Sequence, residues 1–128
     1  YNFIRALPAK IIMHNIGIID SIANVIFLAS DERYSNPASS FLFHGVGFDI
    51  MQPQRFEEKE LREKLAIIER DQKSIAGIIS ERTKLKENEI IEMFFRAKTK
   101  NPEEAKEAGI IKDIKLAKIP EGSQIISL

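Results

Sequence analysis

Apolar residues recur along the chain at two different spacings, which predict alternating strands and helices. Residues 10–15 and 39–44 each contain three adjacent apolar residues, a pattern typical of short strands covered on both faces. Between these runs lies a helical stripe formed by Ile22, Val25, Ile26 and Ala29. Two strands joined through a helix predict a βαβ unit, and hence a parallel sheet with a right-handed crossover. The polar residues 31–37 are predicted to form a surface loop.

The longest predicted element is a helix over residues 55–82. Its narrow apolar seam has alternating spacings of four and three, with one polar member: Leu61, Leu65, Ile68, Gln72, Ile75 and Ile79. Acidic residues 57, 58 and 60 favour the start of a helix there. A helix of about 25 residues is close to 40 Å long at about 1.5 Å per residue. Because so small a domain cannot cover that length, we expect part of the helix to project and to pack on another subunit.

Shorter elements follow the long helix. Residues 86–95 predict a helix with an apolar face. Residues 101–109 carry complete helix punctuation, with Asn101 as N-cap, Pro102 in the first turn and Gly109 after the end. Residues 110–111 and 114–116 suit a strand or two, and residues 124–128 an edge strand.

Composition excludes several functional classes. Nineteen Lys and Arg balance nineteen Asp and Glu, so no net charge points to nucleic acid or an anionic membrane. The chain has no Cys and no apolar stretch near the roughly 20 residues of a membrane helix. Two scattered histidines offer no metal site, and no phosphate-binding glycine motif indicates a cofactor. We expect a single cytoplasmic domain of 128 residues with no metal and no cofactor.

One serine and one histidine are candidates for hydrolytic chemistry. A glycine turn at Gly17 followed by Ser21 and a helix exposes a hydroxyl at a helix N-terminus, where free N–H groups favour negative charge. His44 ends the second strand, and in a parallel sheet this is the edge at which Ser21 lies. Ser21 is therefore the candidate nucleophile and His44 the candidate base. On pattern alone, a helix cap and a strand-end histidine remain the alternative. His14 is expected to be a sheet histidine with a satisfied hydrogen bond rather than a ligand.

These pieces occur in an order that resembles the proteolytic subunit of the Clp protease family, within the crotonase-like fold. The resemblance spans residues 3–114. It rests on the stretch from Gly17 to Asn24, the strand ending at His44, the long helix, and the late motif from Glu104 to Ile111. It implies an α/β fold in which a parallel sheet is flanked by helices and one long helix projects as a handle.

The resemblance also implies roles for particular residues. Ser21 corresponds to the nucleophile, His44 to the general base, and the backbone N–H of Ile22 to one of two oxyanion donors, each worth about 3–4 kcal/mol in hydrolases. It implies a serine peptidase that acts on peptides or proteins, a ring of identical subunits and, by analogy, an AAA+ unfoldase as partner.

The chain departs from the family pattern in two respects. The family's other oxyanion donor lies in a glycine-rich loop that would precede Tyr1, so we expect the chain to be a fragment lacking its N-terminal half. The position of the family's third catalytic residue, usually Asp, falls on Ala97. An orienting group would then come from Thr99, Asn101 or a backbone carbonyl, or Ser21 and His44 would act as a dyad. Two other functions stay open: a catalytically inactive structural subunit of a mixed ring, and a crotonase-like acyl-coenzyme A enzyme.

Overall fold

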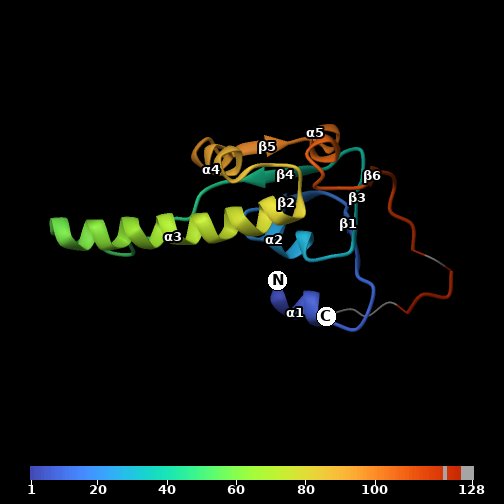
Figure 1. Ribbon diagram of the computed structural model, residues 1–128, viewed down its shortest axis with the longest axis horizontal. Coiled ribbons are helices and arrows are strands. Elements are labelled where there is room, and N and C mark those ends of the chain that lie inside the picture. Colours follow the sequence, from blue (N-terminus) through green and yellow to red (C-terminus); the bar gives the residue numbers. More distant parts are fainter. Residues whose placement is uncertain (120, 125–128) are drawn as a thin grey trace.

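A computed structural model describes residues 1–119 and 121–124 of the chain. Helices and strands follow one another in a mixed α/β order (Figure 1). The elements are α1 (Asn2–Ala6), β1 (Ile12–Asn15), β2 (Ile18–Asp20), α2 (Ala23–Leu28), β3 (Glu32–Ser35), β4 (Ser40–Phe43), α3 (Glu58–Arg82), α4 (Glu87–Phe95), β5 (Lys98–Lys100), α5 (Pro102–Glu107) and β6 (Asp113–Ile114).

The strands form two small sheets rather than one. β1, β3 and β6 pair in parallel, with β3 in the middle. β4 is the middle strand of the second sheet, parallel to β2 and antiparallel to β5. The predicted parallel arrangement flanked by helices is confirmed. The predicted βαβ unit is wrong in its partners, because β1 pairs with β3 and β4 pairs with β2.

Strand β3 corrects the prediction of a loop over residues 31–37. The segment reads as polar, but Tyr34 and Ser35 are buried and the backbone pairs with β1 on one side and β6 on the other. Neighbours on both sides satisfy its backbone groups, which local composition does not reveal. β1 in turn is not covered on both faces, because Ile12 is exposed.

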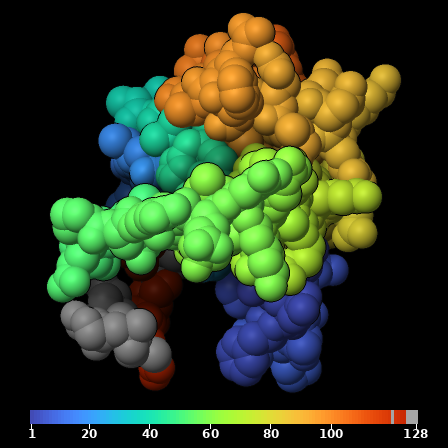
Figure 2. Space-filling model, turned by 90° about the vertical axis from the view of Figure 1, so that its left-hand side faces the viewer, coloured from blue at the N-terminus to red at the C-terminus, as the bar shows by residue number. Residues whose placement is uncertain are grey.

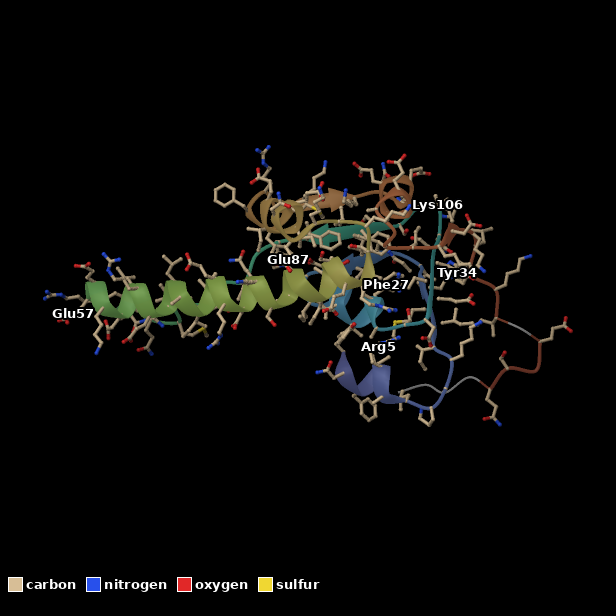
Figure 3. All side chains as sticks on the ribbon, in the orientation of Figure 1. Arg5, Phe27, Tyr34, Glu57, Glu87 and Lys106 are labelled. Carbon is tan, nitrogen blue, oxygen red and sulfur yellow. The ribbon has the colours of Figure 1, made fainter. Side chains whose placement is uncertain are left out.

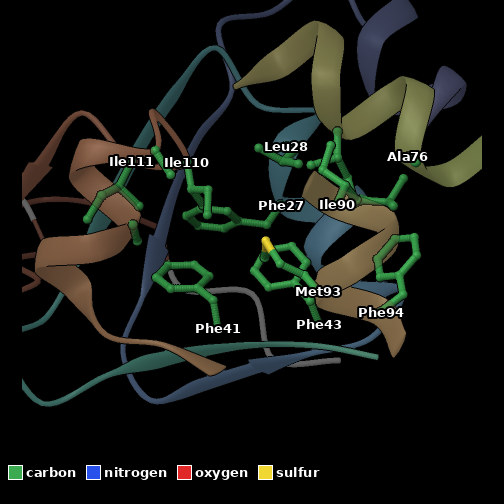
Figure 4. Close-up of a cluster of buried hydrophobic side chains, with 14 residues drawn as sticks. Phe27, Leu28, Phe41, Phe43, Ala76, Ile90, Met93, Phe94, Ile110 and Ile111 are labelled. Carbon is green, nitrogen blue, oxygen red and sulfur yellow. The ribbon is translucent and has the colours of Figure 1, made fainter. Parts of the chain in front are cut away.

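The core lies between β4, α2 and the helices that cover them (Figure 4). Phe41 and Phe43 from β4 meet Phe27 and Leu28 from α2. The other large members come from α3, α4 and the segment after α5: Ile79, Ile90, Met93, Phe94, Ile110 and Ile111. Residues 110 and 111, expected in a strand, are buried core residues outside any strand, and only Asp113–Ile114 pairs with the sheet.

Helix α3 extends well beyond the rest of the molecule (Figure 1). It has 25 residues and begins with a capping box in which Glu57 and Glu60 satisfy each other's backbone N–H groups. Figure 2 views the molecule from the outer end of this helix, so that this end lies in front of the rest of the molecule. The predicted long projecting helix is therefore confirmed.

The later helices also follow their sequence signals. Asn101 caps α5 by accepting a hydrogen bond of 2.8 Å from the Glu104 N–H, and Gly109 ends the segment with a φ of 72°. The predicted strand over residues 124–128 lies outside the described residues from 125 onward.

Candidate active site

Ser21 lies on a sharp turn between β2 and α2. Its backbone has a φ of 54°, a left-handed conformation that is uncommon for residues other than glycine. The Ser21 N–H donates to the Leu42 carbonyl of β4 at 3.1 Å, which fastens the turn to the neighbouring strand. The residues before Ser21 were expected to be a glycine turn, but Ile18–Asp20 form strand β2 because they pair with β4. A strained strand-to-helix turn is the setting that exposes a nucleophilic hydroxyl in many hydrolases.

The next residue offers a backbone donor beside the Ser21 hydroxyl. Ile22 begins the turn into α2, and its carbonyl accepts from the N–H groups of Val25 and Ile26. Within residues 1–119 and 121–124, the Ile22 N–H itself donates to no acceptor. The role of this N–H as an oxyanion donor stays a prediction.

His44 follows directly after β4, at the same edge of the sheet as Ser21. The pairing of Asp20 with Leu42 brings the ends of β2 and β4 level with each other. The His44 Nδ1 lies 2.9 Å from the Gly45 carbonyl oxygen, and Nε2 lies 3.5 Å from Asp20 Oδ1. With the hydrogen on Nδ1 donated to that carbonyl, Nε2 is the ring nitrogen left to accept a proton.

A cavity of about 350 Å³ lies where these two residues meet. Its walls come from the Ser21 turn, the segment after β4, the inner end of α3 and α4. The lining residues are Ser21, Ile22, Phe43, His44, Gly45, Val46, Gly47, Ile75, Ile79 and Phe94. Among the described residues, no hydrogen bond joins the Ser21 hydroxyl to the His44 ring. The structure therefore brings Ser21 and His44 to one pocket without a direct bond between them.

Ala97 lies beside His44 in the backbone. The antiparallel pairing of β4 and β5 ends at Phe43 and Lys98, and the next residues on the two segments are His44 and Ala97. The Phe94 carbonyl also accepts from both Gly45 N–H, at 3.1 Å, and Ala97 N–H, at 3.3 Å. Ala97 has a φ of 47°, in the region where Asn and Asp are enriched among residues other than glycine. An alanine supplies no carboxylate here.

Of the other groups that the sequence suggested for orienting His44, only a backbone carbonyl contacts its ring within the described residues. Thr99 pairs with Leu42 and is exposed, and Asn101 is engaged as the cap of α5. Neither hydrogen-bonds His44 in the part of the chain that the structure describes. The Gly45 carbonyl is the acceptor at His44 Nδ1, which matches the backbone-carbonyl alternative.

Two polar residues near the site were missed by the sequence prediction. Asn24 is buried, and its Nδ2 donates to the carbonyls of Leu42, at 2.7 Å, and Ser21, at 3.1 Å. It thereby ties the serine turn to β4. Asp20 is the other, and its contact with His44 depends on the pairing of β2 with β4. The predicted stripe on α2 also differs, because Ile22 and Ile26 are exposed while Asn24 and Phe27 face the core.

Elsewhere the described residues hold no group of three or more metal-ligating side chains. None of the helices described is long and apolar enough to cross a membrane. His14 in β1 has its Nε2 2.8 Å from the Lys115 carbonyl, which confirms the predicted sheet histidine with a satisfied hydrogen bond.

The chain is an α/β protein with parallel strands flanked by helices, and one pocket holds both a serine on a left-handed turn and a histidine at the same sheet edge. The family model of the Clp protease matches residues 1–118, and the chain belongs to that family. At the level of the family, this supports a Clp-like peptidase. A comparison with curated proteins found no match.

Proposed function

We propose that the chain is a serine-type peptidase subunit that cleaves peptide bonds through an acyl-enzyme on Ser21. The observation that carries the proposal is the shared pocket, in which Ser21 on its left-handed turn and His44 at the end of β4 face the same space. Membership of the Clp protease family supports the choice of peptides and proteins as substrates.

The proposed reaction has two halves. Ser21 Oγ bonds to the substrate carbonyl carbon while its proton passes to His44 Nε2, and the Ile22 N–H donates to the oxyanion. His44 then gives that proton to the leaving amine as the peptide C–N bond breaks. Water hydrolyses the ester by the same route, with His44 again as base, and Ser21 regains its proton.

The projecting helix and the family support an assembly of identical subunits in a ring. The outer part of α3 carries exposed apolar side chains that a second copy could cover. An AAA+ unfoldase is proposed as partner by family analogy alone.

A fluorophosphonate probe tests the proposal on the assembled protein. Label mapped by mass spectrometry to Ser21, lost in Ser21→Ala and in His44→Gln, would support an activated serine. Ser74→Ala is the matched control, because Ser74 is an exposed serine on α3 that does not line the cavity, and its labelling should equal that of the unaltered protein. Absence of label on an intact assembly would reject the catalytic role.

A catalytically inactive structural subunit is the second candidate function. Ala97 beside His44, in place of a carboxylate, is the observation that favours it. The fluorophosphonate probe distinguishes the two functions, because an inactive subunit would assemble but its Ser21 would not be labelled.

A further inference from the structure

A carboxylate approaches His44 from the serine side of the site. Asp20 Oδ1 lies 3.5 Å from His44 Nε2, and Asp20 directly precedes Ser21. Both side chains are about half-exposed, at 54% for Asp20 and 42% for His44. Among the described residues, this is the carboxylate that pairs with His44.

The acid of a serine hydrolase triad performs two tasks. It accepts the Nδ1 hydrogen, which fixes the tautomer and orientation of the ring, and its negative charge stabilises the imidazolium that forms after proton transfer. In this chain the Gly45 carbonyl meets Nδ1 at 2.9 Å and can perform the first task. A neutral carbonyl dipole supplies much less charge stabilisation than a carboxylate, so the second task needs another group.

We propose that Asp20 is a positioning residue that stabilises the His44 imidazolium in place of the acid absent at residue 97. This inference rests on the proposed function. The proton that leaves Ser21 Oγ resides on His44 Nε2 until the leaving amine takes it, and Asp20 stays ionised throughout. The two tasks of one acid are thereby divided between the Gly45 carbonyl and the Asp20 carboxylate.

The distance suits this role better than it suits a fixed ion pair. Charge-assisted N–H···O bonds are about 2.7–2.9 Å long, so a carboxylate at 3.5 Å acts through its charge without holding Nε2 in a direct hydrogen bond. The nitrogen therefore stays accessible to the Ser21 hydroxyl. Because the pair is half-exposed, its charge interaction is screened and its effect is modest.

The test compares Asp20→Asn with the same change combined with Ala97→Asp, using the rate of Ser21 labelling and peptide turnover. Asp20→Asn keeps the shape of the side chain and removes its charge. We expect a loss of about fivefold, as for a partly exposed ion pair. Ala97→Asp places an acid beside His44 on a backbone that accepts Asp, and should restore the rate of Asp20→Asn to within about twofold. Asp49→Asn, an exposed carboxylate in the segment after β4, is the matched control and should leave the rate unchanged.

A spectroscopic measurement tests the contact without relying on activity. In protein labelled with ¹⁵N histidine, Asp20→Asn should move the ring-nitrogen signals of His44 and leave those of His14 in place. His14 is a suitable internal reference because it lies in β1, in the other sheet, and its Nε2 is hydrogen-bonded to the Lys115 carbonyl.

The outcomes separate the two proposals. If Asp20→Asn labels on Ser21 at least as fast as the unaltered protein, Asp20 has no such role, and the proposal of a serine peptidase stands. A loss that Ala97→Asp does not repair would likewise show that Asp20 does not replace the missing acid. Unaltered protein that does not label on Ser21 would overturn the peptidase, and the role of Asp20 with it.

Discussion

The two halves of α3 have the same spacing of apolar residues but different surroundings. The inner half, residues 71–82, packs against α4 and α2, and it buries Ala76 and Ile79. Its last residue, Arg82, donates to the carbonyls of Leu28 and Ser30. The outer half, residues 58–70, leaves Leu61, Leu65 and Ile67 exposed, and its side chains spread into open space (Figure 3).

This contrast shows what a periodic pattern can and cannot specify. A seam at helical spacing predicts a helix and tells which face is apolar. It does not tell what covers that face, because the partner comes from elsewhere in the fold or from another molecule. Ile79 is 1% exposed and Leu65 is 54% exposed, although both belong to the same seam.

The largest expected effect comes from removing a buried side chain in the inner half. Ile79→Ala leaves a cavity in the core and should lower the free energy of unfolding by about 2–5 kcal/mol. Urea denaturation measures the difference. Leu65→Ala in the outer half is the matched control, expected to cost under about 0.5 kcal/mol in the unassembled chain. Equal losses for the two would contradict the contrast between the halves.

The second prediction adds volume instead of removing it. Ala76 is fully buried, so Ala76→Leu forces side chains or backbone to move and should destabilise the fold by about 1–3 kcal/mol. Ala66→Leu makes the same change on the exposed outer half. There it should leave the thermal midpoint almost unchanged, and a matching fall at both positions would mean that the outer half is packed after all.

Lowering the pH should reduce the stability of the folded chain, because Glu32 in β3 becomes protonated. Hydrogen bonds from Lys10 and Tyr34, and the nearby charge of Lys112, lower the pKa of Glu32 from 4.5 to about 2. A lowered pKa in the folded state means that the stabilisation is complete above about pH 4.5 and is lost as the pH falls through about 2. Glu32→Gln should flatten the pH dependence of the unfolding midpoint in that window. Glu63→Gln, an exposed carboxylate on the outer half, should leave the curve as it is.

The smallest expected effect concerns residues 48–56, the segment that precedes α3. Lys64 lies 4.5 Å from the ring centre of Phe48 and 5.5 Å from that of Phe56, so its charge attracts both rings. Lys64→Ala should speed hydrogen exchange in residues 48–56 by a few-fold and leave global unfolding unchanged. Lys59→Ala, whose charge pairs with Glu63, is the control. Unchanged exchange in Lys64→Ala would show that the rings do not hold the segment.

Local sequence signals were enough to predict α2, α3, α4 and α5 and the strand β4 at the site. The capping residues of α5, the seam of α3 and the apolar run of β4 each predicted the element found. The polar strands β3 and β5 were missed because their stability comes from pairing across the chain, as in the pairing of Phe43 with Lys98.

Part of the candidate site could also be predicted from the sequence and part could not. Ser21 and His44 could be expected at one sheet edge because parallel strands align their ends. Asp20 and Asn24 could not be assigned to the site, since their partners, His44 and the Leu42 carbonyl, depend on the register of β2 against β4. Only the folded chain shows that Gly45 supplies the acceptor at His44.

Helix α3 extends from the pocket to the far end of the molecule. Ile75 and Ile79 on its inner half line the cavity beside Ser21, while its outer end stands free of the body. A straight helix of 25 residues is a stiff rod of about 37 Å. One continuous helix therefore supplies part of the cavity wall at one end and an exposed apolar surface at the other.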